Sequence, residues 1–230
     1  MLVLRPSSQR GSADHGWLKS QHSFSFANYY DPAHMGFSKL RVINQDIVQP
    51  DKGFGTHGHQ DMEIISYVLE GNIAHKDNRG NVRTLPAGEF QLMSAGTGIT
   101  HSEYNHSHNE TLKFLQIWIE PNVKGHTPGY QQRDFGQNEG LTHIISPNAA
   151  NGTLQVKQDM HLQQLILSSG HQTHLTSKHP NQYVHLVNGK LDINGIEMQA
   201  GDGLKITNEE KLVFKSIDEE TLKALVFELP

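Results

Sequence analysis

Two short polar patterns in the chain together supply the ligands of a transition-metal site. A His-x-His pattern contains His57 and His59, and a His-x-Glu pattern further along contains His101 and Glu103. In a β-strand, side chains at positions i and i+2 leave the same face, with roughly 6.6 Å between their Cα atoms. Two such strands that face each other would direct three imidazoles and one carboxylate to one point. This ligand set suits a divalent transition metal with positions left open for chemistry, and a chain without cysteine cannot form a thiolate site.

Each pattern alone has a simpler interpretation, because short motifs often occur by chance. The chain contains 16 histidines, which raises the chance of a His-x-His pattern. The first pattern could be two exposed histidines in a glycine-rich loop, and the second a polar strand end after the turn at residues 96–98. We expect His75 in an exposed turn, with a place in the pocket as the alternative. Surface positions are also expected for five histidines in polar surroundings: His106, His108, His171, His174 and His179.

The distribution of apolar residues predicts an all-β chain. Only 35% of the 230 residues are hydrophobic and 21 are glycine, and the apolar residues come in short runs separated by turn signals. No window has a convincing helical period of useful length. Many short strands in one chain indicate a sandwich or a barrel. The expected strands span residues 40–48, 63–69, 112–119, 141–145, 154–157, 162–168, 183–191, 211–214 and 222–229.

A weak internal repeat indicates two copies of one β unit. Residues 68–72 (VLEGN) resemble residues 186–190 (LVNGK), and an Ala-Gly-acidic turn follows in each copy. The copies would meet near residues 125–150, where Gly, Pro, Gln and Asn concentrate. A site that is used once should disappear as a set from the second copy, so the alignment favours a functional role for the four polar residues. The residues aligned with them are Leu175, Ser177, Phe214 and Ser216.

Composition disfavours several other classes of function. The formal net charge is −5 and Lys and Arg do not cluster, which argues against a nucleic-acid surface. We find neither an apolar stretch of about 18–20 residues for a membrane span nor the apolar core of a secretory signal, so we expect a cytoplasmic protein. The chain has no cysteine nucleophile and no Gly-x-Ser-x-Gly elbow, which argues against nucleophilic hydrolysis.

Three segments carry a resemblance to a known family. Residues 53–71 (GFGTHGHQDMEIISYVLEG) and 86–105 (PAGEFQLMSAGTGITHSEYN) resemble the two cupin motifs in the form found in pirins, and residues 17–37 (WLKSQHSFSFANYYDPAHMGF) resemble the same family. The likeness covers most of the chain and is closest to the bacterial pirin-like proteins described as quercetin 2,3-dioxygenases. It implies a bicupin, with two tandem antiparallel β-barrels of the double-stranded β-helix or jelly-roll type.

The resemblance also implies where the metal site lies. Residues 1–130 would form an N-terminal metal-binding cupin barrel, and residues 131–230 a degenerate C-terminal cupin barrel without metal. The implied metal ligands are His57, His59, His101 and Glu103. Most cupins take their carboxylate ligand from the first motif, where Glu63 is the counterpart, whereas pirins take it from the second. Glu63, Asp61 and Gln116 could orient the imidazoles from behind, or could be solvated strand residues.

The function implied by the resemblance is that of a metal-dependent dioxygenase. Such an enzyme would open the heterocycle of a flavonol such as quercetin with O2 and release carbon monoxide. Iron(II) is the favoured metal, although copper, nickel, cobalt and zinc suit the same ligands. Glu103 would be the catalytic residue that takes the proton of the flavonol hydroxyl.

Two alternatives to this enzyme remain. One is a non-enzymatic regulatory protein that senses metal or redox state and binds a protein partner, as the eukaryotic pirins are thought to do. The other is a sugar-binding or isomerase cupin, which the pirin-type position of the carboxylate disfavours.

Overall fold

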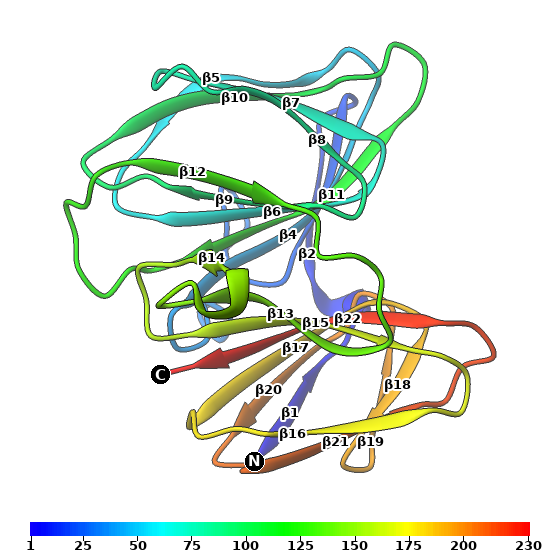
Figure 1. Cartoon of the computed structure of the whole chain (residues 1–230). Coiled ribbons are helices and arrows are strands. Elements are labelled where there is room, and N and C mark those ends of the chain that lie inside the picture. Colours follow the sequence, from blue (N-terminus) through cyan, green and yellow to red (C-terminus); the bar gives the residue numbers. More distant parts are fainter. The chain divides into compact units, whose positions relative to one another are not determined.

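The computed structural model describes residues 1–230, and β-strands dominate it (Figure 1). Its only helices are two single 3₁₀ turns, Ser7–Gln9 and Ala150–Gly152. None of its helices has the length and apolar character that a membrane span needs. The expected all-β class is confirmed.

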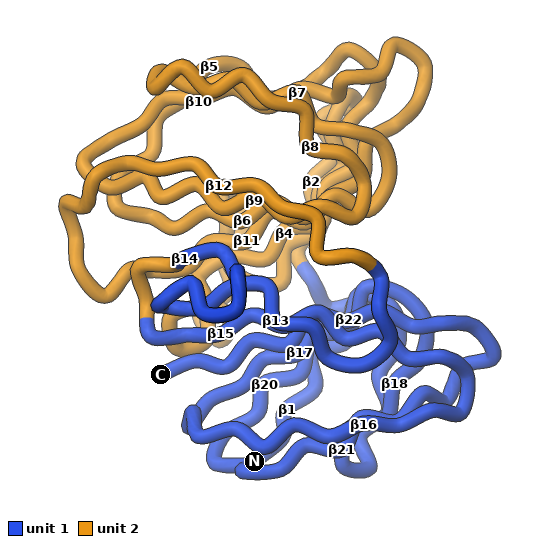
Figure 2. The backbone as a smooth tube through the Cα atoms, in the orientation of Figure 1, with its two compact units in different colours: residues 1–10, 137–155, 159–230 blue, residues 11–136, 156–158 orange.

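The chain folds into two compact units, which Figure 2 shows in different colours. Unit 2 comprises residues 11–136 and 156–158, and unit 1 comprises residues 1–10, 137–155 and 159–230. The main transition between the units, at residues 136–137, lies inside the region where the composition of the sequence changes. The division of the structure differs from domains of 1–130 and 131–230 mainly in the first ten residues, which belong to unit 1.

Unit 2 consists of two antiparallel sheets. One has seven strands in the order β12-β9-β6-β11-β4-β3-β2, and the other has four in the order β5-β10-β7-β8. The sheets face each other, because Ser66 on β6 donates a hydrogen bond to Glu103 on β10. The unit is therefore a jelly-roll sandwich of two sheets. Its strands are β2 Gly11–Asp14, β3 Leu18–His22, β4 Leu40–Val48, β5 Gly53–His59, β6 Glu63–Glu70, β7 Asn72–Asp77, β8 Val82–Pro86, β9 Phe90–Ser94, β10 Ile99–Asn105, β11 Leu112–Ile119 and β12 Gly129–Arg133.

Unit 1 repeats this arrangement. Its seven-stranded sheet has the order β1-β20-β17-β22-β15-β13-β14, and its four-stranded sheet the order β16-β21-β18-β19. The only parallel pair is β13 with β14. The strand at the N-terminus, β1, pairs with β20 in the place that β12 takes beside β9 in unit 2. The strands are β1 Leu2–Arg5, β13 Gly140–Ser146, β14 Leu154–Gln155, β15 His161–Leu167, β16 Gln172–Thr176, β17 Asn181–Asn188, β18 Lys190–Ile193, β19 Ile196–Gln199, β20 Gly203–Thr207, β21 Lys211–Ser216 and β22 Leu222–Leu229.

The turns of the sequence repeat occupy equivalent places in the two units. Gly71 joins β6 to β7 with φ of 81°, and Gly189 joins β17 to β18 with φ of 85°. A Cβ atom at these glycines would lie 3.3 Å from the Cα of Leu112 and 3.1 Å from the Cα of Leu222, respectively. Both positions therefore require glycine, for its backbone conformation and for its size. The internal repeat is confirmed.

The interior of unit 1 is largely apolar, but it contains one buried histidine. His185 on β17 is 1% exposed, and neither of its ring nitrogens has a hydrogen-bond partner. Burial, together with the positive charge of Arg10, lowers the pKa of His185 to about 3. The imidazole is therefore neutral in the folded protein, whereas in the unfolded chain it takes up a proton near pH 6.5. Its contribution to stability is complete above pH 6.5 and is lost as the pH falls towards 3.

We predict that His185→Leu reduces the loss of stability on acidification. Between pH 7.5 and pH 5, the wild-type protein should lose up to about 2 kcal/mol through His185, since each pH unit below 6.5 costs about 1.4 kcal/mol. The measurement is thermal unfolding of metal-free protein at both pH values. The exposed His174 on β16 supplies a control, because His174→Leu should leave the difference in Tm unchanged. An equal loss of Tm in wild type and His185→Leu would contradict the prediction.

Candidate metal centre

The strands that carry the two polar patterns lie side by side in the four-stranded sheet of unit 2. β5 and β10 pair in antiparallel fashion, with His57 directly opposite His101 and His59 opposite Ile99. The sequence analysis expected two strands facing each other, whereas they are neighbours in one sheet. Adjacent strands are about 4.8 Å apart, so cross-strand pairing alone is enough to bring these side chains together.

The pairing of β5 with β10 is irregular between the two polar residues of the His-x-Glu pattern. The register shifts between His101 and Glu103, so that Glu103 lies opposite Phe54. Such bulges redirect side chains and are common beside functional sites. The shift depends on Gly53, because a Cβ atom there would lie 2.3 Å from the carbonyl oxygen of Glu103 and 2.5 Å from the Cα of Tyr104. No other residue fits this close approach of the two strands.

Three imidazoles converge as the sequence predicted. The ligand atoms of His57, His59 and His101 lie within 4.8 Å of one another. The ring centroids of His57 are 4.8 Å from His59 and 4.5 Å from His101, and the Nε2 atoms of His59 and His101 are 3.1 Å apart. Ring nitrogens that point at one another in this way can share a cation. The donor set fits a divalent transition metal.

The protonation of these rings suits a metal. Burial lowers the pKa of His59 to about 4 and that of His101 to about 3, and the neighbouring imidazoles act in the same direction. Both rings are therefore neutral at pH 7 and keep a lone pair for a ligand bond. The Nδ1 of His57 donates a hydrogen bond to the carbonyl oxygen of Gly55 at 2.8 Å. This bond holds the ring and leaves its Nε2 available for a metal.

Glu103 lies next to this group, on its buried side. Its side chain forms a second group of potential ligands with His101 and His75, in which the ligand atoms again lie within 4.8 Å of one another. Burial raises the pKa of Glu103 to about 7, although the hydrogen bond from Ser66, at 3.2 Å, opposes the shift. Within the fold, this carboxyl can therefore gain or lose a proton close to neutral pH.

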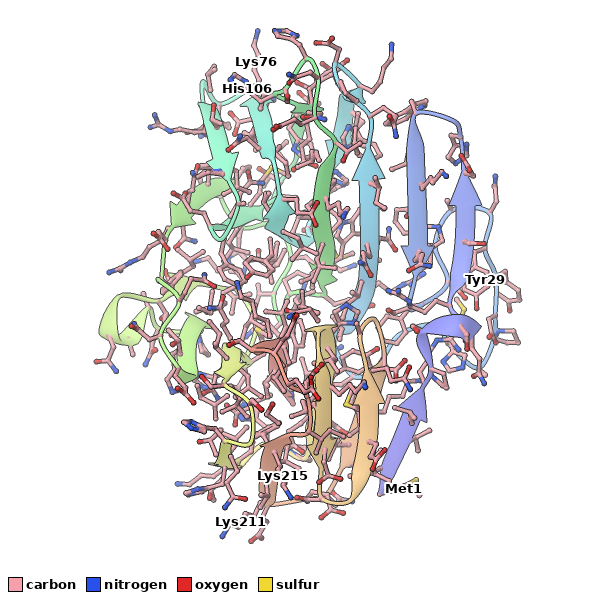
Figure 3. All side chains as sticks on the ribbon, turned by 90° about the vertical axis from the view of Figure 1, so that its right-hand side faces the viewer. Met1, Tyr29, Lys76, His106, Lys211 and Lys215 are labelled. Carbon is pink, nitrogen blue, oxygen red and sulfur yellow. The ribbon has the colours of Figure 1, made fainter.

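His75 is part of the site, and the expectation of an exposed turn position was wrong. It is 1% exposed, because side chains alternate along β7 and every second residue points inward. Lys76, the next residue, points outward at the surface (Figure 3). The Nε2 of His75 lies 3.3 Å from Asp77, which also accepts hydrogen bonds from the backbone N–H of Arg79 and from Asn81. These hydrogen bonds within the turn hold Asp77 in place, and Asp77 orients the imidazole of His75.

The three residues expected behind the ligands have different roles. Glu63 is buried, but it accepts hydrogen bonds from Ser94 at 2.9 Å and from the backbone of Lys157 at 3.2 Å, so it is a structural carboxylate. Asp61 accepts a hydrogen bond from the backbone of Gly125 and stabilises a loop. Only Gln116 lies at the site. The histidines expected at the surface include His106, which is exposed (Figure 3).

A cavity of about 70 Å³ opens beside His57, His59 and Glu103. Its walls are largely aromatic, and its remaining polar residues come from β4 and β11. The sequence analysis did not identify most of these residues. A signal was present in β4, where three successive polar residues, Asn44, Gln45 and Asp46, interrupt an apolar strand, and the first and third share its inner face. The remaining lining residues are Phe26, Asn44, Asp46, Phe54, Phe114, Gln116 and Trp118.

Unit 1 has no imidazole or carboxyl at the equivalent positions, where Ser177 takes the place of His59 and the other residues are apolar. Leu175 pairs with Leu212 as His57 pairs with His101, and Phe214 pairs with Ile193 as Glu103 pairs with His75. The sequence alignment was correct for Leu175 but was displaced by two residues on β21. The four residues are Leu175, Ile193, Leu212 and Phe214, and all belong to or pack on the apolar core of unit 1.

Comparison with known sequences gives the family. Residues 3–119 match the pirin family, and residues 143–229 match the family described as the quercetinase C-terminal cupin domain. The chain belongs to the pirin family. This confirms the resemblance and the bicupin architecture.

Several relatives of this pirin match it over nearly its whole length. It is 48% identical to a protein of Escherichia coli K12 named quercetin 2,3-dioxygenase, covering 100% of this chain and 99% of that protein. It is 38% identical to a pirin-like protein of Caulobacter vibrioides, covering 96% and 97% of the two chains. The crystal structure of the bacterial pirin YhhW of Escherichia coli in complex with nickel(II) has a TM-score of 0.96 with this pirin, 48% identity, and coverage of 100% and 99%.

We predict that His101→Ala removes tight binding of a divalent ion. The loss should exceed the roughly 10–100-fold that removal of an outer hydrogen-bond partner costs, because a ligand itself is lost. The measurement is titration of metal-free protein with Ni²⁺, followed by metal analysis after gel filtration. His174→Ala removes an exposed histidine of unit 1 and should retain one ion per chain. Equal stoichiometry and affinity in the two variants would contradict the assignment of His101.

Proposed function

We propose that this pirin is a metal-dependent dioxygenase that opens the heterocyclic ring of flavonols such as quercetin. The observation that carries the proposal is a group of three converging imidazoles with a buried carboxyl beside an aromatic cavity. Support comes from the 48% identity, over the full chain, to a protein named quercetin 2,3-dioxygenase. The reaction consumes one flavonol and one O2 and yields one depside and one carbon monoxide, so its atoms balance without a further reductant.

The proposed ligands of the metal are His57, His59, His101 and Glu103. When bound, the metal would supply a Lewis acid for the flavonol hydroxyl and a centre that brings the substrate and O2 together. We favour iron(II), and copper, nickel, cobalt and zinc suit the same donor atoms. The nickel(II) complex of YhhW supports the binding of a divalent ion.

Glu103 is the proposed catalytic base. It is buried and borders the cavity, so its carboxylate would accept the proton of a flavonol hydroxyl and hold it during the reaction. Ser66 keeps the carboxyl in place through its hydrogen bond. The deprotonated flavonol is more electron-rich and therefore more reactive towards O2. Phe26, Phe54 and Trp118 provide the flat apolar walls that a fused aromatic substrate needs.

We predict that Glu103→Gln lowers kcat for quercetin by about 100-fold or more, the usual contribution of a positioned base. The measurement is aerobic loss of quercetin absorbance together with release of carbon monoxide, for protein whose metal content has been determined. Glu197→Gln, on an exposed position of β19, is the matched control and should have wild-type activity.

Two results would contradict the proposal. One is equal turnover by metal-stripped or Glu103→Gln protein, which would show that the site does not catalyse the reaction. The other is stoichiometric metal binding with no consumption of any flavonol. That second result would favour the regulatory alternative, in which the bound metal serves sensing alone.

A further inference from the structure

The cavity beside the metal centre has a polar edge that the proposed reaction does not use. The edge is formed by Asn44 and Asp46 on β4 and by Gln116 on β11. Gln116 lies directly opposite Asn44, and the aromatic ring of Phe114 lies opposite Asp46. Asn44 and Asp46 are two residues apart and therefore point to the same face of the sheet. All three polar side chains border one cavity with aromatic walls.

Asp46 presents an acceptor oxygen to this cavity. It is 4% exposed, and its Oδ1 accepts a hydrogen bond from Ser20, which lies opposite it on β3. Its Oδ2 has no hydrogen-bond partner in the protein, although the residue lines the cavity. Burial raises the pKa of this carboxyl to about 7, and the hydrogen bond from Ser20 opposes the shift. A buried carboxylate with a free oxygen is costly unless a ligand or water donates to it.

A neighbouring amide presents a donor. The Oδ1 of Asn44 accepts a hydrogen bond from His22 at 2.9 Å, so the NH2 group of Asn44 remains for the cavity. The amide of Gln116 lies 3.2 Å from the hydroxyl oxygen of Ser66, whose single proton is donated to Glu103. An acceptor beside a donor complements a hydroxyl group that has another oxygen close to it on the same ligand.

Asp46 lies at the end of this edge that is farther from Glu103, whereas Gln116 at the other end contacts Ser66. Ser66, which contacts Glu103, is on β6, and Asp46 is on β4, with β11 between them. At about 4.8 Å per strand, two strand spacings amount to roughly 10 Å across the sheet. A ligand that reaches both ends must therefore carry polar groups on different rings of an aromatic framework.

We propose that Asp46 is a specificity-determining residue that accepts a hydrogen bond from a phenolic hydroxyl on a ring remote from the metal centre. The substrate class is thus narrowed to aromatic compounds that carry a second hydroxyl group at the far end of the molecule. Asn44 assists by donating to an oxygen atom beside that hydroxyl. The inference rests on the proposed function for the orientation of the substrate, with its reacting hydroxyl at the metal centre.

The test compares quercetin with 3-hydroxyflavone, which has the same reacting hydroxyl and ketone but no hydroxyl groups on its outer rings. Binding is measured without oxygen, on metal-loaded protein at pH 8, by quenching of tryptophan fluorescence; Trp118 lines the cavity. The wild-type protein should bind quercetin at least tenfold more tightly than 3-hydroxyflavone, as expected for a hydrogen bond to a charged group. In Asp46→Asn this preference should disappear, with the affinity for 3-hydroxyflavone unchanged within about twofold.

Two further variants separate recognition from folding. Ser20→Ala keeps the carboxyl but removes the group that orients it, so it should lower the preference for quercetin only in part. Asp14→Asn changes an exposed aspartate on β2 of the same sheet and should behave as wild type. Thermal unfolding and Ni²⁺ stoichiometry identify any variant whose fold or metal centre is disturbed.

The possible outcomes also distinguish this inference from the proposed function. It is overturned if Asp46→Asn weakens both ligands equally, if the variant keeps the wild-type preference, or if wild type has no preference or binds neither flavonol. Aerobic turnover is then measured separately on the same proteins. Selective binding without turnover would support the role of Asp46 and refute the dioxygenase. Turnover of both compounds without selective binding would support the dioxygenase and refute the role of Asp46.

Discussion

The pairing of β5 with β10 is the constraint on which the rest of the site depends. It places His57 directly opposite His101, so the separation of the imidazoles follows from the spacing of two hydrogen-bonded strands. Metal–ligand bonds of about 2.0–2.2 Å tolerate little movement, and a sheet holds its side chains more firmly than a loop does. The shift in register before Glu103, which Gly53 permits, then sends the carboxyl to the inner side of the group. One local irregularity thus distinguishes the role of Glu103 from that of the histidines.

Comparison of the two units shows that the fold does not require the polar residues of the metal centre. In unit 1, leucine and phenylalanine occupy the places of His57, His101 and Glu103 and complete an apolar core. The same topology is therefore built with a serine in place of His59 and without any imidazole or carboxyl at these positions. In unit 2, buried groups such as His101 and Glu103 have strongly shifted pKa values, which means that the fold disfavours their charged forms. The fold does not require these residues and disfavours their charged forms. A binding or catalytic role therefore explains their presence best.

The features that the sequence predicted correctly are those with a local cause. β4, β11 and β22 begin and end where their apolar runs do, and the His-x-His spacing is sufficient to align two imidazoles on one strand. The place of β1 in unit 1 could not be predicted, because it depends on pairing with β20, some 200 residues further along the chain. His75 was misassigned for a related reason. A short segment between two turns looks exposed until the inward face of β7 is known.

Asp46 and Glu103 lie in similar environments at the two ends of the cavity. Each is a buried carboxyl whose pKa is raised to about 7 by burial, and each accepts a hydrogen bond from one serine. Neither serine can satisfy both oxygens of its carboxyl, so each end of the cavity retains capacity to accept a proton or a hydrogen bond. An aromatic ligand with hydroxyl groups at both ends would satisfy the two carboxyls at once. The apolar ring system between the hydroxyls would pack on the aromatic walls and exclude water. In the proposed reaction the two ends would differ in consequence, because the hydroxyl proton would be transferred to Glu103, whereas the hydrogen bond to Asp46 would only share it.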